Sequence, residues 1–284
     1  LSGDGNVLAV GATENDGNGS KSGQVRIFAF NNGTWAQRGS DIDGENIGDQ
    51  FGTSVSLSND GSIVAIGSRQ NSGNGINAGH VRVYEYNNNN WSQLGSDIDG
   101  EAAYDFSGGA VSLSDDGSIL AIGATGNDGN GVESGHTRVY KFLNSSWSQL
   151  GSDIDGESTS DWSGGSVSLS GDGGILAIGA ISNDGNGNNT NAGHVRVYEL
   201  DSNSTWVQIG SDIDGENNSD FSGISISLSK DGSNLAVGAY LNDGNIISPS
   251  NSNSGHVRIY FDNSSPSSQI LTTSQSGSYY AQVT

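Results

Sequence analysis

The 284-residue chain has no cysteine, few basic residues and no long apolar run. Without cysteine it forms neither disulfides nor thiolate metal sites. No apolar stretch approaches the roughly 18 residues of a membrane-spanning helix, so no membrane insertion is expected. Ten basic residues stand against 32 acidic ones, a net charge of −22. Nucleic-acid binding is disfavoured, since phosphate contacts need a basic face. An acidic surface suits a secreted protein or one that gathers cations.

One segment is copied along most of the chain, and such a repeat indicates the architecture class. Tryptophan recurs in steps of 56, 56 and 59 residues, at Trp35, Trp91, Trp147 and Trp206. The run Ser-Asp-Ile-Asp-Gly-Glu recurs with the same steps. Five copies of an apolar run end in glycine, at Gly11, Gly67, Gly123, Gly179 and Gly238.

The copy over residues 110–165 predicts four strands. Val111 and Leu113 alternate with serine, which is the period of a strand, and Asp-Gly and Asn-Gly dipeptides mark the turns. We expect strands A to D at about 110–114, 118–124, 135–142 and 147–154. Four antiparallel strands repeated at this length predict an all-β β-propeller with five blades. The alternatives are part of a six- or seven-bladed ring and a flat solenoid.

The expected organisation is a propeller over residues 1–262 and a tail over residues 263–284. The first copy lacks most of strand A and the fifth lacks strand D, so we expect the tail to supply at least one of them. Missing upstream sequence, in a larger ring, is an alternative. Another is that residues 277–284 open an immunoglobulin-like module. Because the chain starts inside a strand, we expect a processed product or a fragment.

The repeat resembles an FG-GAP repeat, as found in the integrin α-subunit head and in many secreted microbial proteins. The resemblance rests on Phe51-Gly-Thr-Ser-Val-Ser-Leu-Ser, Ala65-Ile-Gly-Ser and Gly79-His-Val-Arg-Val-Tyr. It recurs at Phe106-Ser-Gly, Trp162-Ser-Gly and Phe221-Ser-Gly. It implies a β-propeller, usually seven-bladed, with an extracellular adhesion or binding role. The family's proline after Gly-Ala is absent, and its A–B cation loop is reduced to Ser-x-Asp-Gly, so those calcium sites are not carried over.

The Asp-Ile-Asp-Gly-Glu runs are the first candidate site. Ca²⁺ takes six to eight oxygen ligands, and acidic residues at relative positions 1, 3, 5 and 9 resemble the spacing of calcium loops. The glycine stands at position 4 rather than 6, so turn formers that pair with arginine are the alternative. The candidate calcium ligands are Asp41, Asp43, Glu45, Asp49, Asp97, Asp99, Glu101, Asp105, Asp153, Asp155, Glu157, Asp161, Asp212, Asp214, Glu216 and Asp220.

Other repeated residues favour structural roles. The Asn-Asp-Gly-Asn-Gly loops between strands B and C are glycine-rich turns or sites for a cation or sugar. We expect the strand C arginines to be buried against carboxylates; they are Arg26, Arg82, Arg138, Arg196 and Arg258. Packed imidazoles are expected at His80, His136, His194 and His256, and edge-covering indoles at the four tryptophans. Glycosylation acceptors recur at the C–D turn, at Asn32, Asn90, Asn144 and Asn203.

The chain is therefore expected to be an extracellular or cell-surface, non-enzymatic binding or adhesion module. Its repeated surfaces suit multivalent, calcium-assisted contacts with glycans, matrix, proteins or copies of itself. A structural subunit or spacer of a larger assembly is the alternative. A propeller glycoside hydrolase is disfavoured, because nearly every acidic residue belongs to the repeat, whereas catalysis usually needs one asymmetric site.

Overall fold

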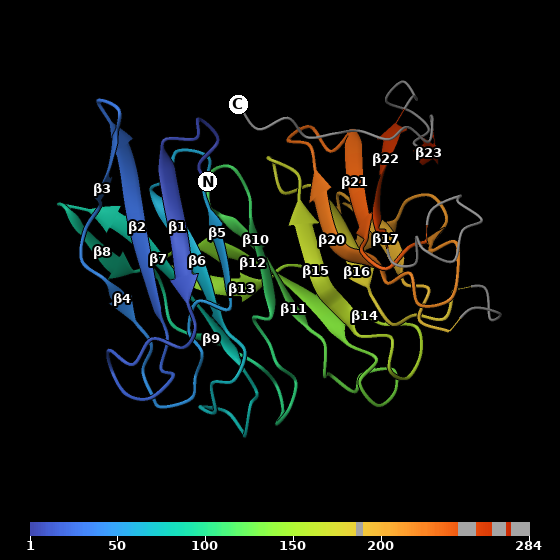
Figure 1. Cartoon of the computed structure of the whole chain (residues 1–284), viewed down its shortest axis with the longest axis horizontal. Coiled ribbons are helices and arrows are strands. Elements are labelled where there is room, and N and C mark those ends of the chain that lie inside the picture. Colours follow the sequence, from blue (N-terminus) through green and yellow to red (C-terminus); the bar gives the residue numbers. More distant parts are fainter. Residues whose placement is uncertain (186–189, 244–253, 263–270, 274–284) are drawn as a thin grey trace.

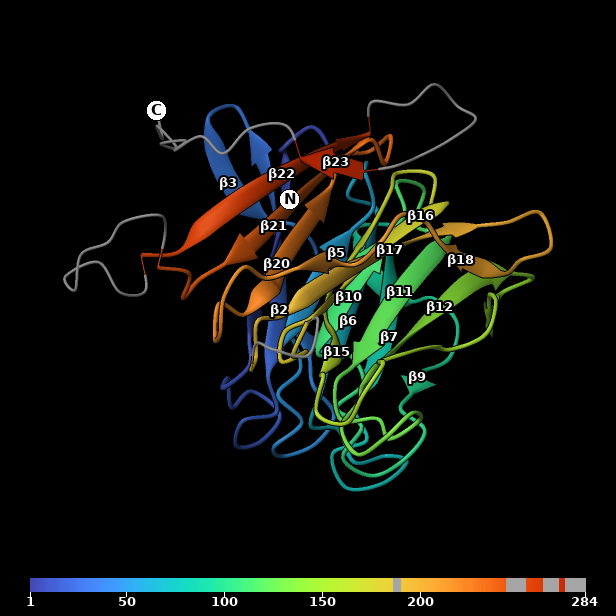
Figure 2. The same cartoon turned by 90° about the vertical axis from the view of Figure 1, so that its right-hand side faces the viewer.

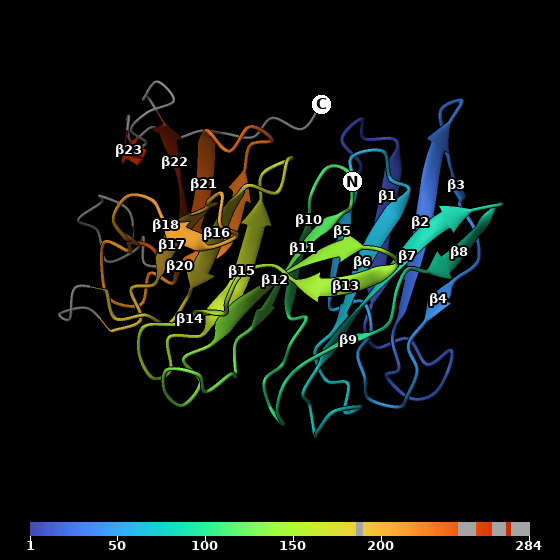
Figure 3. The same ribbon diagram turned by 180° about the vertical axis from the view of Figure 1, so that it is seen from behind.

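The computed structural model describes residues 1–185, 190–243, 254–262 and 271–273. In these residues, 23 strands form five antiparallel sheets, one for each copy of the repeat. Each sheet is a propeller blade, and the blades follow the chain along an arc (Figures 1 and 3). The all-β propeller prediction is thus confirmed. Within the described ranges, no helix is long and apolar enough to cross a membrane.

Each complete blade runs from strand A through B and C to strand D, which is split into two pieces. Blade 1 contains β1 (Val7–Ala12), β2 (Gln24–Asn31), β3 (Thr34–Gln37) and β4 (Ile42–Asp43). Blade 2 contains β5 (Ser54–Leu57), β6 (Ile63–Ser68), β7 (His80–Asn87), β8 (Asn90–Gln93) and β9 (Ile98–Asp99). Blade 3 contains β10 (Ala110–Leu113), β11 (Ile119–Ala124), β12 (His136–Leu143), β13 (Ser146–Gln149) and β14 (Ile154–Asp155). Blade 4 contains β15 (Ser163–Leu169), β16 (Ile175–Ala180), β17 (His194–Leu200), β18 (Trp206–Gln208) and β19 (Ile213–Asp214). Blade 5 contains β20 (Ser222–Leu228), β21 (Asn234–Ala239), β22 (His256–Asp262) and β23 (Leu271–Thr273).

Strand D departs from the sequence prediction, because it is broken in the middle. In blade 3, β13 pairs with one half of β12 and β14 pairs with the other. Gly151 lies between the two pieces at a φ of 81°, a left-handed conformation that glycine adopts without a Cβ penalty. The break gives the Asp-Ile-Asp-Gly-Glu run its own short strand beside the start of strand C.

The two terminal blades differ from the other three. Among the described residues, no strand pairs with the free edge of β1, so blade 1 lacks strand A. In blade 5, β23 from the C-terminal part of the chain lies along β22 in the place of strand D. The immunoglobulin-like alternative concerns residues 277–284, which lie outside the described residues.

The core lies between blades, since each of the three middle sheets buries both of its faces. In β11, the side chains of Leu120, Ala121 and Ile122 are all at most 2% exposed. Leu120 and Ile122 pack with Val81 and Val83 of blade 2, in an apolar cluster shared by two blades. Burial of such side chains contributes roughly 1.5–3 kcal/mol each, so most of the folding free energy arises between copies.

A glycine at the end of strand B lets neighbouring blades touch backbone to backbone. A Cβ atom placed on Gly123 would lie 2.0 Å from the carbonyl oxygen of Gly164 in blade 4. The same holds for Gly67 against Gly108, at 2.0 Å, and elsewhere along the arc at Gly11 and Gly179. Any side chain at these positions would push two blades apart, which explains the glycine near the end of strand B in blades 1 to 4.

The A–B turns form a second link between blades, along the inner side of the arc. The Asn59 backbone N–H donates to the carbonyl of Asp115, whose own N–H donates to Gly171, and the Gly171 N–H donates to Lys230. The Gly3 N–H begins this series by donating to Asn59. One residue from each blade thus joins a row of backbone hydrogen bonds, while strands β5, β10, β15 and β20 lie side by side.

Opposite faces of the first and last blades are uncovered. Val10 in blade 1 is 44% exposed, whereas its equivalent in blade 2, Ile66, is fully buried. Val257 in blade 5 is 61% exposed, whereas its equivalent Val81 is fully buried. Figure 2 shows the arc from the side of blade 5. The described residues therefore form an open arc, in which each end blade presents a face that is covered in the other blades.

We predict that Gly123→Ala lowers the free energy of unfolding by about 3 kcal/mol or more, because the new methyl group meets backbone atoms that cannot turn away. Chemical denaturation measures the loss. Gly109→Ala is the matched control, because its Cβ would meet its nearest atom at 3.4 Å, an ordinary contact. Equal stability of the two variants would contradict the proposed close approach.

Candidate functional site

A polar cluster recurs at each blade interface, and we call it the seam cluster. Its centre is the strand C arginine of one blade, which pairs with the glutamate of the Asp-Ile-Asp-Gly-Glu run in the preceding blade. Arg138 Nη1 lies 3.2 Å from Glu101 Oε1, and Arg82 pairs in the same way with Glu45. Further along the arc, Arg196 meets Glu157 and Arg258 meets Glu216.

The arginines of the seam clusters in blades 2, 3 and 4 are only 7–8% exposed, as predicted from the sequence. The prediction is wrong for Arg26 and Arg258 of the end blades, whose side chains are 49% and 24% exposed. Each also binds a backbone carbonyl or a carboxylate near strand D. Arg138 Nη2 donates to the Asp99 carbonyl at 3.0 Å, and Arg196 Nη2 donates to Asp155 at 2.7 Å. Arg82 Nε donates to Asp97 at 3.2 Å. The buried guanidinium groups therefore tie each blade to its neighbour.

The first and last acidic positions of the run have different partners. The carboxylate at position 1 accepts a hydrogen bond from a glutamine of its own strand D, as Asp153 does from Gln149 at 2.6 Å. The aspartate at position 9 is buried, and Asp161 accepts from the Ser158 N–H and from the Asn183 amide of the next blade. Asp49, Asp105 and Asp220 make the same contacts with Asn71, Asn127 and Asn242.

The structure therefore distributes the sixteen predicted calcium ligands over several places. Within one run, position 1 accepts from its own strand D, position 5 faces the arginine of the next blade, and position 9 binds an asparagine of the next blade. In two copies this asparagine also donates to position 5, as Asn127 does to Glu101 and Asp105. Position 3 lies on the short strand β4, β9, β14 or β19, and Asp43 accepts from Gln24 there at 2.8 Å. Calcium binding by these residues stays a prediction. The second predicted cation or sugar site, the B–C loop, supplies the asparagine that holds position 9.

The structure instead brings together carboxylates from two consecutive runs, with a histidine between them. The grouped residues share one geometry, with all ligand atoms within 4.8 Å of one another; the groups are Glu45, His80 and Asp97, then Glu101, His136 and Asp153, then Glu157, His194 and Asp212. Such acidic and histidine groups have the donor atoms to hold a metal ion. The sequence placed these histidines far from one another, but it did not show that each meets two carboxylates.

Burial controls the charge of these imidazoles. His80, His136 and His194 are 1–2% exposed. Desolvation lowers the pKa of each, and it brings the pKa of His194 to about 4, while the carboxylates around His80 oppose the shift. At neutral pH the imidazoles are therefore uncharged. Burial also raises the pKa of Glu157, against the attraction of Arg196.

The tryptophans of blades 2 to 4 cover the blade edges, as expected, whereas Trp35 of blade 1 does not. The indole N–H of Trp91 donates to the Arg38 carbonyl of blade 1 at 2.8 Å, and Trp147 donates to Leu94 of blade 2 at 2.8 Å. Trp206 repeats the contact with Leu150. Trp35 of blade 1 is 44% exposed. These indoles are interblade links, and their ring edges are not free for a ligand in blades 2 to 4.

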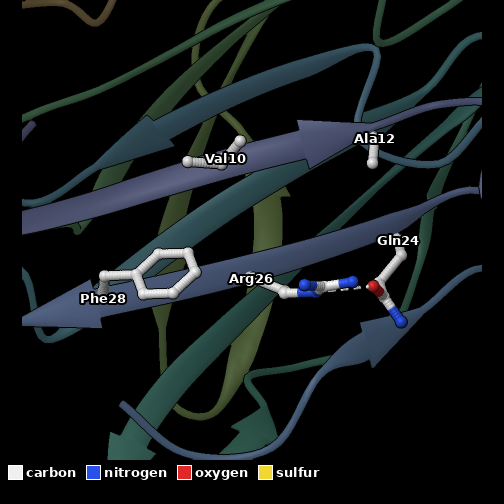
Figure 4. Close-up of a pocket in the computed structure, with 5 residues that line it drawn as sticks. All are labelled: Val10, Ala12, Gln24, Arg26 and Phe28. Carbon is white, nitrogen blue, oxygen red and sulfur yellow. Dashed lines mark hydrogen bonds between the residues drawn. The ribbon is translucent and has the colours of Figure 1, made fainter. Parts of the chain in front are cut away.

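A small cavity lies on the uncovered face of blade 1, and Figure 4 shows its lining side chains. It is formed by Val10, Ala12, Gln24, Arg26 and Phe28 of β1 and β2. In blades 2 to 5, the equivalent face meets the glutamate of a preceding run. Here the Arg26 side chain is 49% exposed, lies 3.7 Å from Asp41 of its own blade, and donates to Gln24. The cavity therefore marks an incomplete seam cluster.

Comparison with known proteins agrees with the repeat and the fold. The FG-GAP repeat family matches the chain over residues 42–84, from β4 to the middle of β7. These residues form an FG-GAP repeat. Among curated proteins, no sequence matches this chain significantly.

Solved structures resemble the whole arc. A periplasmic gluconolactonase of Pseudomonas aeruginosa superposes with a TM-score of 0.56 and 14% identity, over 97% of this chain and 69% of that protein. A candidate 6-phosphogluconolactonase of Bacteroides uniformis gives 0.50 and 13%, over 94% of this chain and 81% of that one. At such identities the likeness shows the propeller fold alone.

The FG-GAP register corrects one sequence alignment. Phe51 is fully buried, and the bridge that it forms with Gly23 recurs between Gly79 and Ser107 and between Gly135 and Ser163. Phe51 is thus equivalent to Ser107, not to Phe106 as the Phe-Ser-Gly pattern indicated. The aromatic residues lie one position earlier, in the loop between strand D and the next strand A.

The first prediction for the seam cluster concerns the unequal burial of its arginine and its glutamate. Glu101→Ala leaves the 8% exposed guanidinium of Arg138 without its carboxylate, at an expected cost of about 3 kcal/mol. Arg138→Met keeps the apolar stem and leaves Glu101, whose side chain is 46% exposed, to water, at about 1 kcal/mol. Urea denaturation measures both. A larger loss for Arg138→Met would show that the pair is not the stabilising element.

The second prediction concerns pH. The unfolded chain binds a proton on His194 near pH 6.5, whereas the folded chain binds it only near pH 4. The unfolded state therefore binds more protons in between, so stability is full above pH 6.5 and falls as the pH drops toward 4. Melting curves with chelator present test this: His194→Gln should flatten the slope. The control His256→Gln, with a 26% exposed imidazole, should flatten it less.

Proposed function

We propose that the chain is an extracellular, non-enzymatic binding module that contacts glycans or matrix through one repeated loop rim. The rim consists of the B–C loops and the D–A loops, which connect strand D to the next strand A. Both sets of loops lie at the same end of blades 1 to 3, at the bottom of Figure 1. The observation that carries the proposal is the number of exposed apolar side chains on these loops.

Large apolar side chains rarely stay in water without a partner when they gather in one region. On the rim, Ile47 is 73% exposed, Ile76 60%, Tyr104 53%, Val132 63% and Trp162 40%. These residues come from three consecutive blades. A surface with one such residue or pair per blade offers weak contacts several times over, and a repetitive polymer would engage them together.

The D–A loops hold their aromatic residues in a fixed conformation. Phe106, Trp162 and Phe221 have φ values of 56°, 53° and 52°, a left-handed region that costs non-glycine residues roughly 1–2 kcal/mol. The backbone N–H of Trp162 donates to the Glu133 carbonyl of the B–C loop, and its indole N–H donates to the Glu133 carboxylate at 3.2 Å. These rings are therefore positioned by the fold before any ligand arrives.

The chemistry of the rim favours sugars over nucleic acid. Aromatic rings pack against the C–H faces of sugar rings, and the neighbouring asparagine and aspartate side chains offer hydrogen bonds to hydroxyl groups. The net charge of −22 repels a phosphate backbone. Calcium held by the Asp-Ile-Asp-Gly-Glu runs, which lead into the D–A loops, would assist binding by ordering these loops.

The test is a glycan array with the purified chain, run with millimolar calcium and with chelator. We expect binding to a subset of glycans that Trp162→Ala weakens at least tenfold, and a melting temperature more than about 1 °C higher with calcium. Trp35→Ala is the matched control, because Trp35 is similarly exposed, at 44%, but lies on strand β3 away from the rim. Hydrolysis of gluconolactone above background, or equal effects of the two variants, would overturn the proposal.

A structural subunit of a larger assembly is the second candidate, and the uncovered end faces favour it. Val10 and Arg26 in blade 1, and Val257 in blade 5, occupy positions that other blades bury. A further repeat blade carrying a glutamate equivalent to Glu45 would cover the face of blade 1 and pair with Arg26. Absence of glycan binding together with an association that Arg26→Glu abolishes would select this candidate.

A further inference from the structure

Two buried histidines of the seam clusters each have one ring nitrogen without a hydrogen-bond partner among the described residues, His136 at Nδ1 and His194 at Nε2. His136 is 1% exposed, and its Nδ1 is one of the few buried side-chain atoms in the described ranges that lack a partner. It lies 3.8 Å from Asp153 Oδ2. His80 Nδ1 lies 3.8 Å from Asp97 Oδ2, and His194 Nδ1 lies 3.7 Å from Glu157 Oε2. These distances exceed those of hydrogen bonds, so each buried nitrogen faces a carboxylate that it does not reach.

In the second and third groups, the carboxylate oxygen that faces the imidazole is not the one that another side chain holds. Gln149 donates to Asp153 Oδ1, whereas His136 faces Oδ2. Arg196 lies nearest Glu157 Oε1, whereas His194 faces Oε2. In the first group Arg82 donates to both oxygens of Asp97, and His80 faces Oδ2. The pattern indicates a place for a second positive charge, between the ring nitrogen and the carboxylates.

We propose that each of the three Glu–His–Asp groups binds one divalent transition-metal ion of the Zn²⁺ class, linking two blades. The ligands are Glu45, His80 and Asp97 in the first group, Glu101, His136 and Asp153 in the second, and Glu157, His194 and Asp212 in the third. The glutamate comes from one blade, and the histidine and aspartate come from the next. The ion is therefore a clamp across the seam.

The ligand types and spacings select this class of ion. Zn²⁺ binds imidazole nitrogen and carboxylate oxygen at about 2.0–2.2 Å, so an ion between the two atoms spans the observed 3.7–3.8 Å at an open angle. Ca²⁺ takes six to eight oxygens and does not favour nitrogen. Imidazole with carboxylates suits Zn²⁺, Co²⁺ and Ni²⁺. Because burial keeps the imidazole neutral, its lone pair is available as a ligand.

An ion can enter these groups from solvent, although the histidine is buried. The side chains of Asp97, Glu101 and Asp153 are 31%, 46% and 33% exposed. The adjacent guanidinium offsets one of the two carboxylate charges, so the expected affinity is lower than at cysteine-based zinc sites. Binding to the folded state alone raises stability by mass action.

The uncovered face of blade 1 and the interface between blades 4 and 5 serve as internal controls. Blade 1 has Gln24 at the histidine position, and Gln24 donates to Asp43. His256 of blade 5 faces Glu216 at 3.8 Å, but in the described residues no third ligand completes a group there. The proposal therefore predicts three sites in a chain that has five blades.

The experiment is a titration of the full chain, made without a histidine tag, with Zn²⁺ by calorimetry and with Co²⁺ by absorption spectroscopy. We expect close to three ions per chain, a cobalt spectrum with nitrogen and oxygen ligands, and no displacement by millimolar Ca²⁺. His136→Gln should reduce the stoichiometry to two, and Glu101→Gln should weaken binding at the same site at least tenfold. His256→Gln should leave the stoichiometry and the affinity unchanged.

Several results would overturn the proposal. One is the absence of saturable Zn²⁺ binding, another is a stoichiometry that His136→Gln does not change, and a third is displacement of Zn²⁺ by equimolar Ca²⁺. Circular dichroism of each metal-free variant shows whether it is folded. If His136→Gln does not fold, the cobalt spectrum of the wild-type chain still decides, because a spectrum with oxygen ligands alone would exclude the histidine.

Discussion

A blade of this protein has two apolar faces, and both must be covered by something equally flat. Another blade meets this requirement only if the backbones approach until a glycine touches a carbonyl, as Gly123 does with Gly164. That contact determines the spacing at which the Trp147 indole reaches Leu94 and the Arg138 guanidinium reaches Glu101. The polar contacts across the seam therefore depend on the absence of a single side chain.

The acidic residues are the most prominent feature of the repeat, and much of their role is to connect blades. Asp161 is 3% exposed and binds the Asn183 amide of the next blade, while Glu157 lies beside the next arginine. Carboxylates used in this way are dispersed among several partners, and this dispersal differs from the convergent arrangement of a calcium loop. The seam clusters concentrate charge where two runs meet, and the rim presents apolar side chains to water.

Much of the fold followed from the sequence, because strands and turns are local. The alternation around Val111 and Leu113 and the glycines at the turns located strands A, B and C of blade 3 to within a residue or two. The break in strand D was not predicted, because Gly151 looks like any small residue until its φ of 81° is seen. The shift of one position between Phe51 and Phe106 was not predicted, because the sequence alone does not show which residue after strand D forms the bridge to the glycine before strand C.

The partners across the seam were harder to predict than the strands. The burial of Arg138 and its pairing with an Asp-Ile-Asp-Gly-Glu run were expected from its apolar neighbours. Identical copies, however, offer Arg138 a glutamate on either side in the sequence, Glu101 or Glu157, and only the packing shows that the preceding one is used. The same ambiguity hid the histidine groups, because His136 and Glu101 lie 35 positions apart and in different copies.

The row of backbone hydrogen bonds from Gly3 to Lys230 affects which gains and losses of repeat copies the fold can accept during evolution. The row uses main-chain atoms, so it accepts asparagine, aspartate, glycine or lysine at its steps without altering its geometry. A recombination event that inserts or deletes one whole copy would join donor to acceptor as before. The length of the arc is therefore free to vary between descendants of one ancestor, while every junction remains the same.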